Sequence, residues 1–541
     1  MNNETTTKIT QRRFPRATLS CAVGACIALT GTSAAVSANP VLEEIIVTAR
    51  KRSESVQDVP IAISAFTAKM LEAKGLTDIE KMSRVVPNLN ISSGNGGSGS
   101  AASSSIYMRG IGQSDFLITT DPGVGLYIDN VYFARSMGTV MELIDLDTIE
   151  VLRGPQGTLF GKNTIGGAVL LNSTKPGDEL GGRVQLTAGE FDRLEAKASI
   201  DIPMGDSLLS RFAVIAKTRD GYSDRVIGGR LGDEDVFGGR ATFQWTPSVN
   251  GDVTLVLDSI DREATSAVTA SAAYDPTAPL AGLWSALVAP SVGITTPVNV
   301  NINKPFKTEA TGPNVDDATS SGASVVINWH FDTFSLKSIT AYRELESEFG
   351  RDGDSSSAQY IETHNTGNQD QFSQELQFVG SSFDNRLNWV VGAYYFEETA
   401  DDQNDVRLAS GLYDALEALP VQLSGAPCAP PFLAPGCEGN PINIGLDLDF
   451  DVNNKIENES YALFVHATYA LTDQLNMTGG LRYVDEQKDY TLFHDRVNAG
   501  VPLIPLTNVG LSEQETLPLL SFDYSFDDNS MAYISAAKGF K

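Results

Sequence analysis

Few residues in this chain have the types and the spacing that catalysis or metal binding requires. The four histidines, His330, His364, His466 and His494, lie far apart along the sequence. No nucleophile stands beside a base in a pattern that acid–base or covalent catalysis would need. We therefore interpret each histidine as a structural or loop residue. The sequence predicts that the protein is not an enzyme and that it holds no cofactor or metal.

A glycine-rich stretch could in principle cradle a phosphate group. Its spacing matches neither the P-loop nor the dinucleotide-binding pattern, so nucleotide binding is not expected. Nucleic acid is excluded as a partner too, because the net charge is -29 and such binding needs a basic face. Glycines permit positive φ angles and close backbone approach in a crowded interior, and here they are Gly154, Gly157, Gly161, Gly166 and Gly167.

The first 38 residues have the pattern of a secretory signal peptide. Arg12, Arg13 and Arg16 precede an apolar stretch at 17–29, and Val36-Ser37-Ala38 offers a small-residue cleavage pattern. The alternative is a membrane anchor, for which the apolar stretch is too short. After residue 38 no run of about 18 apolar residues follows, so a spanning helix is not expected.

Cys428 and Cys437 are the two cysteines that remain after cleavage at this site. They bracket a turn-rich segment with three prolines, and export would bring them into an oxidising compartment. No further histidine or cysteine accompanies them, so zinc is not expected. The spacing predicts a small disulfide loop, which we place outside the membrane.

A β-branched segment begins soon after the predicted cleavage site, at Glu43-Glu44-Ile45-Ile46-Val47-Thr48-Ala49. Such a segment favours an extended conformation. An extended, mobile peptide can add a strand to the sheet edge of a partner through main-chain hydrogen bonds. The alternative is an ordinary first strand of the domain that follows.

The rest of the chain divides into two regions with different periodicity. Residues 39–175 indicate one compact α/β domain, with a helix-like stretch at 68–83 and a short strand at 125–129. Beyond about residue 181 the apolar residues recur with period two, the signature of strands. In the segment 461–469, for example, Tyr461, Leu463, Val465, Ala467 and Tyr469 share one face.

The connections between these strands alternate strictly between short and long. This alternation is typical of an outer-membrane β-barrel, which has tight periplasmic turns and long external loops. The short turns are expected near 203–207, 246–251, 332–333, 381–385, 471–474 and 527–530, and the long loops near 223–235, 261–320, 350–368, 398–455 and 487–512. The sequence thus predicts a transmembrane antiparallel β-barrel.

The size of the α/β domain sets the size of the barrel. The pattern yields about twelve strands, which would form a barrel roughly 24 Å across, whereas 22 strands give roughly 44 Å. A globule of about 135 residues is roughly 36 Å wide. We therefore expect this domain to lie in the lumen of a barrel of about 22 strands, of which the chain contains about twelve and lacks the final ones.

Several short motifs resemble those of TonB-dependent outer-membrane receptors, particularly siderophore receptors. The segment 44–49 resembles the TonB box of that family. Residues 55–60, 85–89, 107–110, 124–129, 149–157 and 159–168 resemble its plug domain, and 372–376, 479–483 and 538–541 resemble its barrel. The resemblance implies a signal peptide at 1–38, a TonB box and linker at 39–54, a plug at 55–175 and a partial barrel at 176–541.

The resemblance also implies a function and partners. We expect active import of a scarce nutrient across the outer membrane, energised by a TonB-type protein, with membrane lipid around the barrel. An external small-molecule ligand would be bound, by default a ferric siderophore. Vitamin B12, haem, an oligosaccharide or an aromatic compound are the alternative cargoes. A passive porin or adhesin, which would lack a plug and a TonB box, is the rival class.

Two arginines are expected to hold the plug in the barrel. Arg109 and Arg153 both precede glycine and match the plug arginines of the family. A buried charge needs a partner of opposite sign. With Phe372 and Leu376 facing lipid, period two turns Glu375 into the lumen. Glu375 is therefore the predicted partner of one or both arginines.

Overall fold

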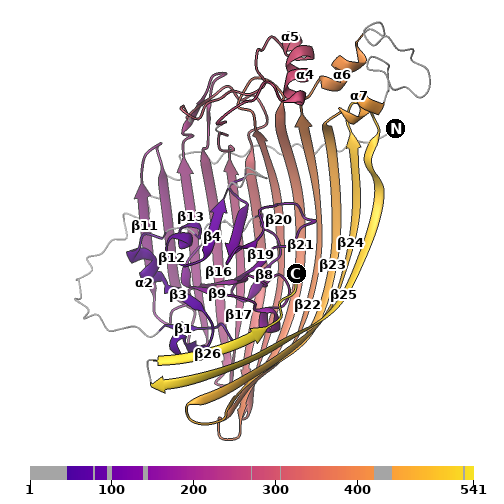
Figure 1. Ribbon diagram of the computed structural model, residues 1–541. Coiled ribbons are helices and arrows are strands. Elements are labelled where there is room, and N and C mark those ends of the chain that lie inside the picture. Colours follow the sequence, from indigo (N-terminus) through magenta and orange to yellow (C-terminus); the bar gives the residue numbers. More distant parts are fainter. Residues whose placement is uncertain are drawn as a thin grey trace, which may run out of the picture.

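The computed structural model describes residues 45–76, 79–93, 100–137, 144–269, 271–304, 306–419, 441–527 and 530–541. A long antiparallel sheet forms a curved wall, and a smaller domain, the plug, lies against its concave side (Figure 1). The predicted signal peptide and the predicted disulfide between Cys428 and Cys437 lie outside the described residues.

The plug is built on a five-stranded sheet with the order β3-β9-β10-β7-β8. β7 and β10 run parallel, and the other neighbours run antiparallel. Apolar side chains of β7, β9 and β10 pack against the helical segments and form its buried core. The strands of this sheet are β3 (Ile63–Thr67), β7 (Val124–Ile128), β8 (Val131–Phe133), β9 (Leu146–Arg153) and β10 (Gly167–Ser173).

The remaining plug elements are short. β4 (Leu89–Ser93), β5 (Ser104–Met108) and β6 (Ile111–Gly112) form a three-stranded sheet, and α3 spans Gly157–Phe160. The helix expected at 68–83 is interrupted: α2 spans Ala68–Ala73, and the 3-10 helix η2 spans Glu80–Arg84. Gly75 explains the break, because its φ of 65° lies in the left-handed region that ends helices.

The wall contains 13 strands among the described residues, and each pairs antiparallel with its neighbours. The strands run in chain order as β11 (Gly181–Ala188), β12 (Leu194–Pro203), β13 (Leu208–Arg219), β16 (Glu234–Ser248), β17 (Gly251–Ala264), β19 (Asp316–His330), β20 (Phe334–Asp352), β21 (Ile361–Ser382), β22 (Leu387–Leu408), β23 (Asp449–Ala470), β24 (Leu475–Arg496), β25 (Pro502–Asp527) and β26 (Ser530–Ala537). β11 and β26 are the two edges, so the sheet is curved but not closed.

The short connections lie where the sequence predicts them, but three of the long loops are shorter than expected. Residues 350–368, 398–455 and 487–512 were expected as loops, whereas β20 to β25 continue well into these ranges. The strands extend past the apolar belt, where polar residues occupy both faces and the period-two pattern of apolar residues disappears. Backbone pairing, which needs no apolar side chain, still continues there.

Side chains alternate between the two faces of the wall. On β23, Leu463 is 64% exposed, whereas its neighbours Ala462 and Phe464 are buried. The exposed face is apolar in this stretch, as a lipid-facing surface requires. No helix among the described residues is long and apolar enough to span a membrane.

Four helices and a small sheet lie beyond the long-loop end of the wall (Figure 1). The helices pack partly around Trp284, which is 1% exposed. The helices are α4 (Pro279–Leu287), α5 (Ala289–Val292), α6 (Leu412–Glu417) and α7 (Pro441–Gly445), and the small sheet contains β14 (Ser223–Arg225), β15 (Arg230–Leu231) and β18 (Lys307–Thr308). We call α4, α5 and α6, together with the loop residues Ala358 and Tyr360 that pack with them, the external cap.

Candidate functional site

The predicted partner-binding segment is described from Ile45 onward, so Glu43 and Glu44 lie outside the described residues. Within it, β1 (Ile46–Val47) pairs antiparallel with β2 (Glu54–Ser55). Val47 and Ala49 are fully buried in a core shared by the plug and the wall, while Ile46 is half exposed. In this structure the segment is therefore a packed strand and not a free peptide.

A buried carboxylate anchors this segment to the plug. The main-chain N–H of Thr48 donates to both Glu150 oxygens at 2.9 and 3.0 Å, and the Thr48 hydroxyl donates to Oε1 at 3.0 Å. Glu150 lies on β9 and is fully buried. Burial raises the pKa of Glu150, and the Thr48 hydrogen bonds oppose that rise. The segment thus supplies most of the donors that this carboxylate needs.

Glu375 joins the wall to Lys51, which lies two residues after the segment. Lys51 Nζ lies 3.2 Å from Glu375 Oε1, and Gln377 Nε2 donates to the same oxygen at 2.7 Å. The ammonium of Lys51 also lies 4.8 Å from the centre of the Phe160 ring. Glu375 is on the inward face of β21 and contacts the plug, but the cation that it pairs with is a lysine next to the TonB-box-like segment.

Arg109 and Arg153 form no ion pair within the part of the chain that the structure describes. Arg109 is exposed, and its guanidinium lies beside Gly154. The backbone N–H and Nε of Arg153 both donate to the Ala62 carbonyl, at 3.0 and 3.4 Å. The structure therefore does not bring either arginine into an ion pair with Glu375.

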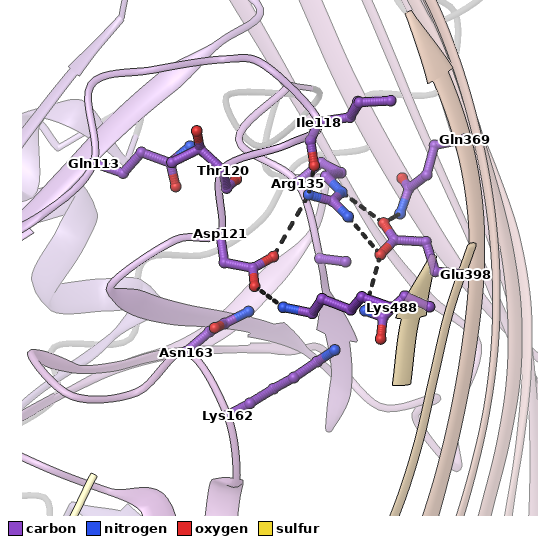
Figure 2. A network of polar contacts seen from close by, with 12 residues as sticks. Gln113, Ile118, Thr120, Asp121, Arg135, Lys162, Asn163, Gln369, Glu398 and Lys488 are labelled. Atoms are coloured by element: carbon purple, nitrogen blue, oxygen red, sulfur yellow. Dashed lines mark hydrogen bonds and ion pairs between the residues drawn. The ribbon is translucent and has the colours of Figure 1, made fainter. Parts of the chain in front are cut away.

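A second set of buried charges holds the plug to β22 and β24, and Figure 2 shows it from close by. Arg135, which follows β8, donates from Nε and Nη2 to the two oxygens of Glu398 at 2.6 and 2.7 Å. Both side chains are almost completely buried. Burial lowers the pKa of Arg135, but the carboxylates of Glu398 and Asp121 together outweigh burial and raise it. The guanidinium therefore stays charged.

Two lysines extend this set, which we call the charge network. Lys162 donates to Glu486 at 2.8 Å, and Lys488 lies 3.2 Å from the same carboxylate. Lys488 also donates to Asp121, which lies on the loop before β7. Burial raises the pKa of Asp121, but Arg135, Lys488 and Lys162 outweigh burial and lower it to about 2.

The loop that carries Asp121 spans residues 113–122 and touches several wall strands. The ring of Phe116 meets Phe349 of β20 edge to face, with centres 5.0 Å apart. The N–H of Ile118 donates to Asp402 of β22 at 3.3 Å, and its carbonyl accepts from Arg135 at 2.6 Å. The loop is thus attached to β20, β22 and β24, and we call it the strap.

Sequence reasoning did not single out the residues of the charge network. Period two would have placed Glu398, Glu486 and Lys488 on the inward face of the wall. The plug members Asp121, Arg135 and Lys162 carry no comparable signal, because the loops that hold them have no periodicity. Their pairing depends on how those loops meet the wall.

The described residues contain no group of three or more histidine, cysteine or acidic side chains arranged to hold a metal ion. His494 instead hydrogen-bonds Asn454 at 2.9 Å, and His364 hydrogen-bonds Glu348 at 3.0 Å. These histidines therefore take part in contacts within the protein.

A plug held by buried charges against a curved antiparallel wall is the arrangement expected of a plugged β-barrel protein. The TonB-dependent receptor plug domain matches residues 55–168, and the β-barrel of TonB-dependent receptor-like proteins matches residues 226–541. The chain belongs to the TonB-dependent receptor family. Members of this family are transport receptors of the cell outer membrane, and that is the location of this protein.

Individual relatives agree with this assignment. The pesticin receptor of Yersinia pestis is 31% identical over 201 residues, which is 37% of this chain and 28% of that protein. The ferripyoverdine receptor of Pseudomonas aeruginosa is 25% identical over 33% of this chain and 21% of its own. The chain therefore matches less than a third of the length of these relatives.

Solved structures share the fold across almost the whole chain. The ferric yersiniabactin uptake receptor of Yersinia pestis superposes with a TM-score of 0.68 at 19% identity, covering 89% of this chain and 64% of that one. The siderophore receptor PiuA of Acinetobacter baumannii gives a TM-score of 0.64 at 13% identity, covering 90% and 65%. At such identities the likeness shows the fold alone.

Proposed function

We propose that this protein imports a ferric siderophore across the outer membrane, using energy delivered by a TonB-type partner. The observation that carries the proposal is the plug held to the wall by buried ion pairs, with the segment Ile45–Ala49 docked on it as a short strand whose β-branched sequence would let it pair with the partner once it detaches. Relatives named for ferric siderophores support the ligand class.

The plug offers a short mechanical route from this segment to the charge network. Lys51 lies over the ring of Phe160, and Lys162, two residues further on, pairs with Glu486 of the wall. A pull on the segment would therefore reach the contacts that hold the plug within a few residues. This arrangement fits a plug that is opened from the periplasmic side.

We further propose that the functional wall is a closed barrel of about 22 strands. Among the described strands, β11 pairs only with β12 and β26 only with β25, so the outer side of each edge strand has no partner. Backbone groups at an open edge cannot stay unpaired in hydrocarbon, which favours closure by further strands. We assign residues 39–54 to the partner-binding arm, 55–175 to the plug and 176–541 to the wall.

A proline substitution tests the role of the segment. Val47→Pro removes a main-chain donor and is expected to reduce uptake of radioactive ferric siderophore to the level of a strain without the TonB-type partner. Val249→Pro is the matched control, because Val249 lies in a short turn, is 97% exposed and should tolerate proline. Normal uptake by the Val47→Pro protein would contradict the assignment.

The cargo is tested with the same strains. Growth limited by iron, and restored by one ferric siderophore only when this protein and the partner are present, is the expected result. If growth instead depends on cobalamin or haem, that compound would be the ligand in place of a siderophore. Uptake that persists without the partner would indicate a passive channel.

A further inference from the structure

We propose that Asp121 occupies a binding position for an anionic oxygen group of the imported ligand, and that the ligand loosens the strap by displacing the Asp121 carboxylate. The anionic group would be a carboxylate, a hydroxamate or a phosphate. This inference rests on the proposed import function. It adds that the recognised group of the ligand is anionic and that the strap responds to its binding.

The charges of the network show why this position accepts an anion. Arg135, Lys162 and Lys488 face Glu398, Glu486 and Asp121, so three cations balance three carboxylates. Glu398 and Glu486 lie on wall strands, whereas Asp121 lies on the strap. If the strap moves, one positive charge loses its counterion in a partly desolvated place, which an incoming anion would compensate.

Exposure indicates which side of the network a ligand can reach. The side chains of Glu398 and Glu486 are 1% and 4% exposed, whereas those of Asp121 and Lys488 are 12% and 13% exposed. Tyr490 follows Lys488 on the same inward face of β24, toward the long-loop end, and is only partly buried. A ligand that enters from the outside would therefore meet Tyr490 and then the Asp121–Lys488 pair.

The contacts of the strap explain how displacement of one carboxylate would be transmitted. Arg135 binds the strap twice, through Asp121 at 3.6 Å and through the Ile118 carbonyl at 2.6 Å. An anion that takes the Asp121 position would retain a counterion for Lys488 and Arg135 and would remove two attachments of the strap, the ion pairs of Asp121 with these two residues. The remaining attachments are the Ile118–Asp402 hydrogen bond, the Ile118–Arg135 hydrogen bond and the Phe116–Phe349 contact.

The test measures binding of inorganic phosphate to the full-length protein in detergent, with the neutral molecule acetamide as a control probe. Asp121→Asn removes the competing charge and is expected to bind phosphate about tenfold more tightly than the wild type, a gain typical of one hydrogen bond to a charged group. Adding Lys488→Met to Asp121→Asn should abolish the gain. Acetamide should bind none of the variants better.

Asp145→Asn is the matched control. Asp145 is also a plug carboxylate paired with a wall cation, Arg211, which keeps Asp201 as a second partner. It should bind phosphate as the wild type does, and so should Asp121→Glu, which retains the competing charge. An Asp121→Asn protein without increased affinity, or an equal gain in Asp145→Asn, would overturn the proposal. This assay needs neither the partner nor a ferric ligand, so its failure would leave the import function standing.

Discussion

Arg135 and Glu398 form the most completely buried ion pair between the plug and the wall for which both side chains are described. A pair of this kind adds little net stability over an apolar pair, but its rupture is costly because it leaves one charge uncompensated. Asp121, at 3.6 Å, is the carboxylate that would remain near Arg135 without Glu398. The main effect of the pair is therefore to make one docked position of the plug much more favourable than others.

Glu398→Ala is expected to destabilise the docked plug by about 3–5 kcal/mol, because the Arg135 guanidinium loses its bidentate partner. The double variant Arg135→Ala/Glu398→Ala should lose less than the sum of the two single changes. The measurement is thiol labelling of Ala168→Cys, a fully buried plug position, in increasing urea. Strict additivity of the two single effects would show that the pair is not coupled.

At the scale of single residues, the sequence predicted which face of a strand a side chain occupies better than it predicted which residue that side chain pairs with. Period two placed Glu375 on the inward side of β21, where the structure also has it. Its partner in the structure is Lys51, 324 positions away in the chain. Nothing in the local pattern distinguishes Lys51 from Arg109 or Arg153 as a partner, since the choice depends on how the plug is placed against the wall.

The external cap is the element that sequence reasoning missed. The ranges 261–320 and 398–455 were expected as polar loops, yet α4 and α6 pack around Trp284. Each helix is short, and its apolar side chains form a core only together with residues from other loops, such as Tyr360, whose ring lies 5.4 Å from that of Trp284. By contrast, the short turns were predictable because each interrupts two strongly periodic strands.

Asp354 should make the stability of this cap depend on pH. Its carboxylate accepts hydrogen bonds from the main-chain N–H groups of Ser356 and Tyr360, in the loop between β20 and β21, and of Ile361 at the start of β21. Burial and the charge of Asp352 raise the pKa of Asp354 to about 6. Because the folded state binds this proton more tightly, the stabilisation is full below about pH 4 and is lost as pH rises through about 6.

The cap is therefore expected to exchange amide hydrogens more slowly at pH 5 than at pH 7, after correction for intrinsic exchange rates. The protected amides should include those of residues 356, 360 and 361. Asp354→Asn cannot titrate and should reduce the pH dependence of this protection. Equal pH dependence in the variant and the wild type would exclude Asp354 as its source.

At the scale of the whole molecule, an apolar belt around the wall sets the level at which the protein sits in the membrane. On β23 the outward residues between Tyr461 and Tyr469 are apolar. The two tyrosines flank them, as interfacial aromatic girdles flank the hydrocarbon layer. Past Tyr461 toward the long loops, the outward positions become charged at Glu459 and Glu457, and the Tyr461 hydroxyl donates to Glu459 at 2.6 Å. The change from apolar to charged marks the outer boundary of the membrane.

Arginine at two heights of the outward face should test this boundary. Leu463→Arg places a charge inside the belt and is expected to lower the unfolding free energy in lipid vesicles by about 2–4 kcal/mol. Leu506→Arg is the matched control: Leu506 is 69% exposed on β25 but lies beyond the belt, next to the pair Thr507 and Leu492, so its cost should be about 0–1 kcal/mol. Guanidinium titration of both proteins in the same vesicles gives the comparison. If the two substitutions cost the same, the lipid boundary does not lie between these levels, and the belt must be assigned to a different part of the wall.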